Sequence, residues 1–289
     1  MPAPSLSGAQ KARAALAERL RELRMDAEIT GRELAGRCGW SESKSSRIEN
    51  AKTAPTDADI RAWCTACGTP ERAADLIAAN RQVTSMYVEW RRLERAGLRH
   101  LQQSSVDLYQ RTRRFHVYCS NLIPGLFQTT AYATALLETI AGFRRIPNDA
   151  AEAAGVRVRR ARSVQEGNHR LAALVEETVL HYRIGDVGVM AGQLGQLLSL
   201  MSLPSVSLGV IPAAAERRGI MWPLETFTMF DQRLVRVELL SASVKITAPS
   251  EVALYLRAFE QLSTLAVHGA QARALIVAAI EKLTTAENG

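Results

Sequence analysis

Apolar positions in the first 80 residues recur at spacings of three and four, a pattern that predicts short amphipathic helices. The first helix is expected from Gln10 to Met25, and its apolar face consists of Ala12, Leu16, Leu20 and Leu23. A fourth and a fifth helix are expected after Pro55 and Pro70. With the two helices between them, they predict a compact all-α five-helix domain over residues 1–80.

The second and third predicted helices are short and lie on either side of a tight turn. Thr30 can cap the second helix, with Glu33 three residues later completing a capping box. Gly39 ends that helix, and the third is expected from Ser41 to about Asn50. Two short helices joined in this way can brace each other, so that the outer face of the second one enters a DNA major groove.

The periodicity changes beyond residue 110. Alternating Phe115, Val117 and Cys119 predict a strand, which Pro124-Gly125 and a helix over residues 129–141 follow. Further strands are predicted in HRLAALVEE (169–177), SVSLGVIP (205–212), ETFTMF (225–230) and LVRVELL (234–240). Further helices are predicted over residues 149–166, 190–202, 249–267 and 270–284. The predicted fold is therefore multidomain: an all-α domain (1–80), a helical linker (81–110) and a C-terminal α+β domain with a small sheet (111–289).

The chain of 289 residues is 47% apolar and carries a formal net charge of +7, with a pI near 9.5. These values fit a globular protein with an acidic partner such as nucleic acid, although they do not require one. Residues 1–69 carry 11 basic and 9 acidic side chains, whereas residues 111–170 carry 10 and 4. The first interpretation of the basic run at residues 157–170 is a solvated helix face, and the second is contact with flanking DNA or an acidic partner.

The sequence shows no run of about 18 apolar residues that would indicate a membrane span. The N-terminal segment also lacks the apolar core and cleavage site of a signal peptide. We therefore expect no membrane partner and a cytoplasmic location, associated with the nucleoid when the protein is bound to DNA.

The third predicted helix has side chains suited to reading DNA. Its core side is expected to hold Ile48, against Leu34 and Ala35 of the second helix. The fork of Arg47 can bind guanine, Glu42 can accept from cytosine, and Ser43 and Ser46 can adapt to several bases, whereas Lys44, Arg32 and Lys52 suit phosphate. The predicted DNA-binding residues are Thr30, Arg32, Ser41, Glu42, Ser43, Lys44, Ser46, Arg47 and Lys52.

The segment TGRELAGRCGWSESKSSRIENAKTAP (30–55) resembles the helix-turn-helix of the XRE family, the class of the phage repressors. This resemblance implies a homodimer that binds an inverted-repeat operator in double-stranded DNA, with the helix from Ser41 to Asn50 in the major groove. It also implies an ion pair between Arg24 and Glu49, the alternative being that both are solvated. Two residues depart from the family pattern: Ser45 replaces the usual Val or Ile, and Ala51 replaces the usual Gly. A left-handed backbone would cost Ala51 about 1 kcal/mol relative to Gly.

The run from residue 85 onward resembles the C-terminal domain that follows XRE-type helices in many actinomycete regulators, including WhiJ-like ones. Its most specific part is Ile123-Pro124-Gly125-Leu126 with Gln128-Thr129 and Tyr132-Ala133. The resemblance implies a small protein partner encoded next to it, as in antitoxin systems. From the residues alone, Gln128 and Thr129 are expected to supply hydrogen bonds at a buried helix start, ahead of a ligand-binding role. Trp90 and Arg91 can form a pocket wall, or Trp90 can be a core residue.

Residues with catalytic or metal-binding chemistry are sparse. Cys64 and Cys67 form a CxxC motif without a second ligand pair, so we expect them to be small apolar side chains on a buried helix face rather than zinc ligands. The strongest catalytic candidates are two adjacent carboxylates, a histidine and an aspartate: Glu176, Glu177, His181 and Asp186. Adjacent residues of a strand point to opposite faces, which argues against a working pair. No GxSxG, Walker or HExxH motif is present. We predict no catalytic residue, metal or cofactor.

Three functional hypotheses follow from these patterns. The first is a sequence-specific, dimeric DNA-binding regulator whose C-terminal domain binds a small protein or a ligand. The second is an antitoxin-like protein that mainly neutralises a small partner and autoregulates its own promoter. The third is an enzyme with a regulatory helix-turn-helix, which requires a polar pocket with convergent acid and base groups.

Overall fold

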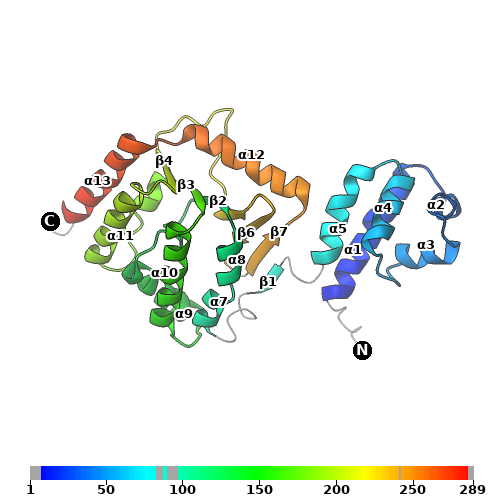
Figure 1. The fold of residues 1–289 in the computed structure, drawn as a ribbon, viewed down its shortest axis with the longest axis horizontal. Coiled ribbons are helices and arrows are strands. Elements are labelled where there is room, and N and C mark those ends of the chain that lie inside the picture. Colours follow the sequence, from blue (N-terminus) through cyan, green and yellow to red (C-terminus); the bar gives the residue numbers. More distant parts are fainter. Residues whose placement is uncertain (1–7, 83–86, 90–96, 241, 286–289) are drawn as a thin grey trace. The chain divides into compact units, whose positions relative to one another are not determined.

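The computed structural model describes residues 8–82, 87–89, 97–240 and 242–285 of the chain (Figure 1). The chain forms two compact units, one of residues 1–87 with 245–252 and one of residues 88–244 with 253–289. Helices build the N-terminal region, and helices with a mixed sheet build the rest of the described chain. The predicted multidomain fold, all-α followed by α+β, is confirmed.

The N-terminal helices match those that the periodicity predicts. They are α1 (Gly8–Asp26), α2 (Gly31–Cys38), α3 (Glu42–Glu49), α4 (Asp57–Ala66), the 3-10 turn η1 (Pro70–Arg72) and α5 (Ala73–Gln82). Their shared core contains Leu20, Leu34, Ile48 and Trp63. The Trp63 indole donates a hydrogen bond to the Leu20 carbonyl at 2.9 Å, so its one polar atom is satisfied inside the core.

The predicted linker, residues 81–110, lies partly outside the described residues, as do Trp90 and Arg91. Its described part contains β1 (Tyr87–Glu89), α7 (Leu98–Gln103) and the start of α8 (Val106–Arg111). Helices α7 and α8 both pack against α10 (Ala150–Glu166). The extent of the linker stays a prediction. Its second half does not run free between two domains, because α7 and α8 pack against α10.

The sheet has the strand order β1-β7-β6-β5-β2-β3-β4. Its other strands are β2 (Arg114–Cys119), β3 (Arg170–Glu176), β4 (Val206–Ile211), β5 (Phe227–Phe230), β6 (Leu234–Glu238) and β7 (Ala242–Ile246). β2, β3 and β4 pair in parallel, whereas β5 is antiparallel to both β2 and β6. Strand β7 was not predicted, and the others correspond to predicted strands or lie in the predicted linker.

Helical crossovers connect the parallel strands, as parallel pairing requires. The remaining helical elements are α9 (Thr130–Arg144) and α10 between β2 and β3, η3 (Glu177–Leu180) and α11 (Val187–Leu200) between β3 and β4, then α12 (Pro249–Leu265) and α13 (Gly269–Thr285). Phe115 and Val117 of β2 join a core with side chains of α9, α10, α11 and α13. His116, on the opposite side of β2, lies against Phe259 of α12 with ring centroids 5.0 Å apart. Helices therefore cover both faces of the sheet.

Candidate DNA-binding site

Capping residues define α2 and α3 and the turn between them. The Thr30 hydroxyl accepts from the Glu33 amide at 3.2 Å, and the Glu33 carboxylate accepts from the Thr30 amide at 2.8 Å, which completes the predicted capping box. Gly39 ends α2 with a φ of 67°, a left-handed conformation that costs glycine little. The Ser41 hydroxyl then caps α3 by accepting from the Lys44 amide at 3.3 Å. The predicted tight turn is confirmed.

The inner side of this helix pair is apolar except at Ser45. Leu34, Ala35 and Ile48 are buried, as predicted. Ser45 is also buried, and its hydroxyl donates to the Glu42 carbonyl at 2.9 Å. This bond within the helix satisfies the hydroxyl, so the departure from Val or Ile leaves no unpaired polar atom in the core.

The outer side of α3 exposes all four predicted base-reading residues: Glu42, Ser43, Ser46 and Arg47. Their exposure leaves carboxylate, hydroxyl and guanidinium groups able to meet base edges in a major groove. Arg32 of α2 lies 3.4 Å from the Glu42 carboxylate, and the two side chains are 85% and 67% exposed. Screening makes such an exposed pair weak, so both groups remain able to exchange partners.

Asn50, at the C-cap of α3, is an exposed residue that the sequence interpretation missed. Its side-chain amide donates to the Ser46 backbone carbonyl at 2.8 Å, which holds the Asn50 side chain on the same side of the helix as Ser46. The signal was present in the sequence, because Asn50 follows Ser46 by four residues and Arg47 by three. An asparagine there extends the set of groups able to bind bases.

Lys44 departs from the expectation that it is available on the outer surface. Its ammonium lies 2.6 Å from the Asp59 carboxylate and 4.2 Å from the centroid of the Trp40 ring. Burial alone would raise the pKa of Asp59, but the hydrogen bonds from Lys44 and Thr56 outweigh it and hold that pKa below its ordinary value. Lys44 therefore ties α3 to α4, and the predicted contact with phosphate requires it to leave this pair.

The four other predicted residues lie at or near the ends of α2 and α3. Thr30 and Ser41 are exposed helix caps, and Arg32 and Lys52 are exposed cations. The Lys52 amide donates to the Arg47 carbonyl at 2.9 Å, which places Lys52 directly after the end of α3. Cations on either side of a reading helix suit the phosphates that border a groove, so phosphate contact by Arg32 and Lys52 stays a prediction.

The predicted ion pair between Arg24 and Glu49 is confirmed. Arg24 Nε and Nη2 both lie 2.8 Å from Glu49 Oε1, and each side chain is 17% exposed. Arg24 Nη1 also donates to the Ile29 carbonyl at 2.8 Å. The end of α1 is thereby fixed to the end of α3 and to the segment that precedes α2.

Ala51 has the left-handed backbone that its family position implies, with a φ of 55°. Its amide donates to the Ile48 carbonyl at 3.0 Å and closes the end of α3. Because a Cβ atom is unfavourable in this conformation, Ala51 costs about 1 kcal/mol relative to glycine.

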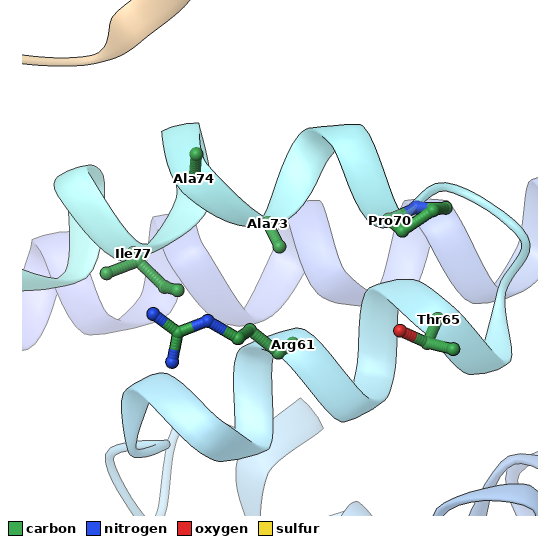
Figure 2. A pocket seen from close by; sticks show the side chains of 6 residues that line it. All are labelled: Arg61, Thr65, Pro70, Ala73, Ala74 and Ile77. Carbon is green, nitrogen blue, oxygen red and sulfur yellow. The ribbon is translucent and has the colours of Figure 1, made fainter.

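A hollow of about 430 Å³ lies beside α4 and α5 (Figure 2). The residues that line it are Arg61, Thr65, Pro70, Ala73, Ala74 and Ile77. Figure 2 shows Arg61 and Thr65 on α4 facing the η1–α5 segment. Arg61 is the one ionisable residue of this lining, so the hollow does not combine an acid with a base.

The four catalytic candidates each have a structural partner. Glu176 is buried at the end of β3, where it accepts from the Tyr118 hydroxyl at 2.7 Å and pairs with Arg217. Glu177 accepts from the Ala213 amide at 2.8 Å and lies 3.9 Å from His181. Asp186 caps α11 by accepting from the Val189 amide at 2.8 Å. The two adjacent carboxylates therefore bind different groups instead of facing each other.

Cys64 and Cys67 are buried in the helical core, as predicted. Burial raises the pKa of each thiol to about 11. Over the described ranges, no group of three or more His, Cys, Asp or Glu side chains is placed to hold a metal ion. Two protonated thiols in an apolar core act as small apolar side chains.

The interpretation of the basic run as one solvated helix face is wrong for two of its arginines. Arg159 and Arg162 are exposed on α10, but Arg160 is only 8% exposed. Arg157 Nη1 donates to Gln128 Oε1 at 2.7 Å inside the second unit. The helical periodicity places Arg160 four residues from buried Val156 and Val164, so the pattern itself indicated the inner face.

The predicted role of Gln128 and Thr129 at the start of α9 is confirmed. Gln128 Nε2 donates to the Ile123 carbonyl at 2.8 Å, and the Thr129 hydroxyl accepts from the Tyr132 amide at 3.2 Å. Gln193 of α11 completes the site, because its side chain accepts from the Thr129 amide at 2.8 Å and donates to the Phe127 carbonyl at 2.9 Å. These bonds satisfy the backbone of a buried turn.

A helix that spans a membrane must be both long and apolar throughout, and this requirement applies to each helix of the described residues. None of them combines the necessary length and apolar character.

Comparison with known proteins gives two family matches, one in each region. The family model described as "Domain of unknown function (DUF5753)" matches residues 102–278, more than half of the chain. The model described as "Helix-turn-helix domain" matches residues 15–76, which include α2 and α3. No curated protein matches the chain. The predicted helix-turn-helix is thus supported by sequence and by geometry, whereas the WhiJ-like subtype stays a prediction.

Proposed function

Starting from the finding that the chain belongs to the DUF5753 family and carries a helix-turn-helix DNA-binding domain, we propose that it regulates transcription by binding an inverted-repeat operator as a homodimer. Helix α3 enters the major groove, and the C-terminal domain binds a small protein partner or a ligand. We also propose that the protein is cytoplasmic, nucleoid-associated when bound to DNA, and neither an enzyme nor a cofactor-binding protein.

The observation that carries this proposal is the construction of α3. The helix is capped by Ser41, fixed at its end by the Arg24–Glu49 pair, and exposes Arg47 beside two serines and a glutamate. A rigid helix with mixed donors and acceptors on one outer face is what base recognition in a major groove requires. The net charge of this region supports DNA binding less strongly, because residues 1–69 carry only two more basic than acidic side chains.

Footprinting of the full chain on its own promoter tests the proposal. A dimer is expected to protect two half-sites of an inverted repeat, with centres one helical turn or a multiple apart, about 10 base pairs per turn. Loss of protection after Arg47→Ala, with the variant still folded, would connect the footprint to α3. Absence of any protected inverted repeat on promoter DNA would contradict operator binding.

A second candidate function is an antitoxin-like protein that mainly binds a small partner. It is favoured by the segment that precedes β5, where Trp222 is 67% exposed and Ile220 is 37% exposed. The Arg217–Glu176 pair and a hydrogen bond from the Leu224 amide to Tyr118 fix this segment on both sides. An exposed tryptophan on a fixed loop suits a protein interface.

Co-purification tests this second function. The full chain is expected to retain the product of an adjacent short reading frame, and Trp222→Ala is expected to weaken that retention, with exposed Leu254→Ala as the control. If the chain retains no such product, or if both variants retain it equally, the Trp222 segment is not its binding surface.

A further inference from the structure

Two arginines of α10 converge on a single neutral oxygen inside the second unit. Arg157 Nε lies 3.3 Å from Gln102 Oε1, and Arg160 Nη2 lies 3.1 Å from the same atom. Arg160 Nη1 also donates to the Gln102 backbone carbonyl at 3.1 Å. Gln102 is 7% exposed and Arg160 is 8% exposed, so two cations share one amide oxygen in a place largely closed to water.

A third arginine, Arg236 of β6, lies close to this pair. The guanidinium of Arg160 is 4.3 Å from the centroid of the Tyr109 ring, and that of Arg236 is 5.4 Å from the Phe230 ring. Tyr109 and Phe230 are themselves in edge contact, with centroids 5.2 Å apart. One aromatic pair therefore brings the guanidinium groups of α10 and β6 together.

The three cations donate no hydrogen bond to a carboxylate among the described residues. Their hydrogen bonds and ring contacts are with amide, carbonyl, hydroxyl and aromatic groups, including Ser105 at 3.4 Å from Arg236 Nη1. Glu238 follows Arg236 by two residues on β6 and is exposed. Its charge raises the pKa of Arg157 and Arg160, but burial outweighs this effect and the pKa of both stays lowered. Burial, and after it the nearby charge of Arg160, lower the pKa of Arg157 to about 10.

Two donor atoms of the cluster are also unused. Arg160 Nε and Arg236 Nε are buried without a hydrogen-bond partner. Buried charges are normally paired, because an unpaired ion and an unsatisfied donor both lose their hydration without compensation. The cluster is costly to the folded chain alone, and an anion would relieve both costs.

We propose that Arg157, Arg160 and Arg236 form a binding site for the oxyanion of a small molecule, a carboxylate or a phosphate group, and that Gln102 Oε1 marks the position of a ligand oxygen. Guanidinium groups bind both oxyanions through paired N–H donors. The site deepens the proposed ligand-binding role of the C-terminal domain. Since Gln102 lies on α7 and Ser105 is the N-cap residue of α8, an oxyanion bound here would join these helices to α10 and β6.

Gln102→Glu supplies the sharpest test, because it places a carboxylate oxygen at the marked position without changing the shape of the side chain. The matched control is Gln103→Glu, which adds the same charge at the exposed neighbour on α7. Binding of inorganic phosphate and of acetate to the full chain is measured by titration calorimetry at constant ionic strength. Unfolding temperature in chloride is measured for each variant.

The wild type and Gln103→Glu are expected to bind at least one of the two anions with the same affinity. Gln102→Glu is expected to bind it at least ten-fold more weakly and to unfold at a higher temperature than Gln103→Glu. Binding of phosphate alone or of acetate alone identifies the preferred oxyanion. A wild type that binds neither anion, or affinity that is unchanged in Gln102→Glu, would overturn the proposal.

A second pair of variants keeps the test decisive if Gln102→Glu does not fold. Arg236→Gln removes one cation of the cluster, and Arg159→Gln removes an exposed cation from α10. The first is expected to lose at least ten-fold in anion affinity, and the second to match the wild type; equal affinities would overturn the proposal. All measurements are made without DNA, so a failure here leaves operator binding intact, and a failed footprint leaves the anion site intact.

Discussion

The ion pair between Arg24 and Glu49 fixes the end of α3, and removing it is expected to lower the free energy of unfolding. In Arg24→Met, the aliphatic part of the side chain is kept while Glu49 loses its cationic partner and the Ile29 carbonyl loses its donor. Apolar packing and the backbone hydrogen bond from the Ile29 amide to the Arg24 carbonyl remain. The variant is expected to fold less stably and to hold α3 less firmly.

The magnitude follows from the burial of the pair. Breaking a fully buried ion pair costs about 3–5 kcal/mol, whereas exposed pairs contribute about 0–1 kcal/mol. Arg24 and Glu49 are each 17% exposed and joined by two contacts of 2.8 Å, which lies between these cases and nearer the buried one. We expect a loss of about 2–3 kcal/mol in the free energy of unfolding.

The assay is denaturant unfolding of the full chain followed by tryptophan fluorescence, in a double-mutant cycle with Glu49→Gln. The matched control cycle uses Arg32 and Glu42, which lie 3.4 Å apart but are 85% and 67% exposed. We expect the first coupling energy to exceed the control, for which about 0–0.5 kcal/mol is expected. Equal couplings in the two cycles would refute the reasoning that partial burial gives this pair its strength.

Three further predictions follow from the same domain. Ala51→Gly relieves the left-handed strain and is expected to raise the free energy of unfolding by about 1 kcal/mol, measured by denaturant titration; a destabilised variant would contradict this. Because the pKa of Asp59 is lowered in the folded state, its stabilisation is present above its unfolded pKa of about 4 and is lost as pH falls through the lower folded value. Asp59→Asn should therefore flatten the acid limb of the stability–pH curve, whereas an unchanged limb would exclude this contribution. The buried thiols of Cys64 and Cys67, with pKa values of about 11, are expected to react with a thiol reagent at pH 8 only on unfolding; rapid native-state labelling of either would contradict their burial.

Local signals in the sequence were sufficient to predict the two helices and the turn of the helix-turn-helix. Capping chemistry acts within three or four residues, so Thr30, Glu33 and Ser41 could be assigned roles without knowledge of the fold. The strands from β2 to β6 were recognisable because buried strands are short apolar runs between turn signals. Strand β7 was missed because its sequence ASVKI alternates weakly and has few large apolar residues.

Contacts between residues that are distant in the sequence were harder to predict. The Arg24–Glu49 pair came from a family resemblance, since no periodicity connects residues 25 positions apart. The Lys44–Asp59 pair was missed for the same reason, and it changes the surface that α3 presents. Arg160 was read as solvated because charge suggests the surface, although the helical spacing placed it among buried valines.

Quantitative binding of a duplex that carries the protected repeat tests the central claim most directly. Affinities of the wild type, Arg47→Ala and the control Arg61→Ala are compared by fluorescence anisotropy at one salt concentration, on the repeat and on copies with single base changes. The account predicts that Arg47→Ala loses about 1–3 kcal/mol, roughly 5- to 150-fold in affinity, and discriminates less among bases at one position of each half-site, while Arg61→Ala binds like the wild type. An Arg47→Ala protein with wild-type affinity and wild-type base preference would contradict a reading role for α3.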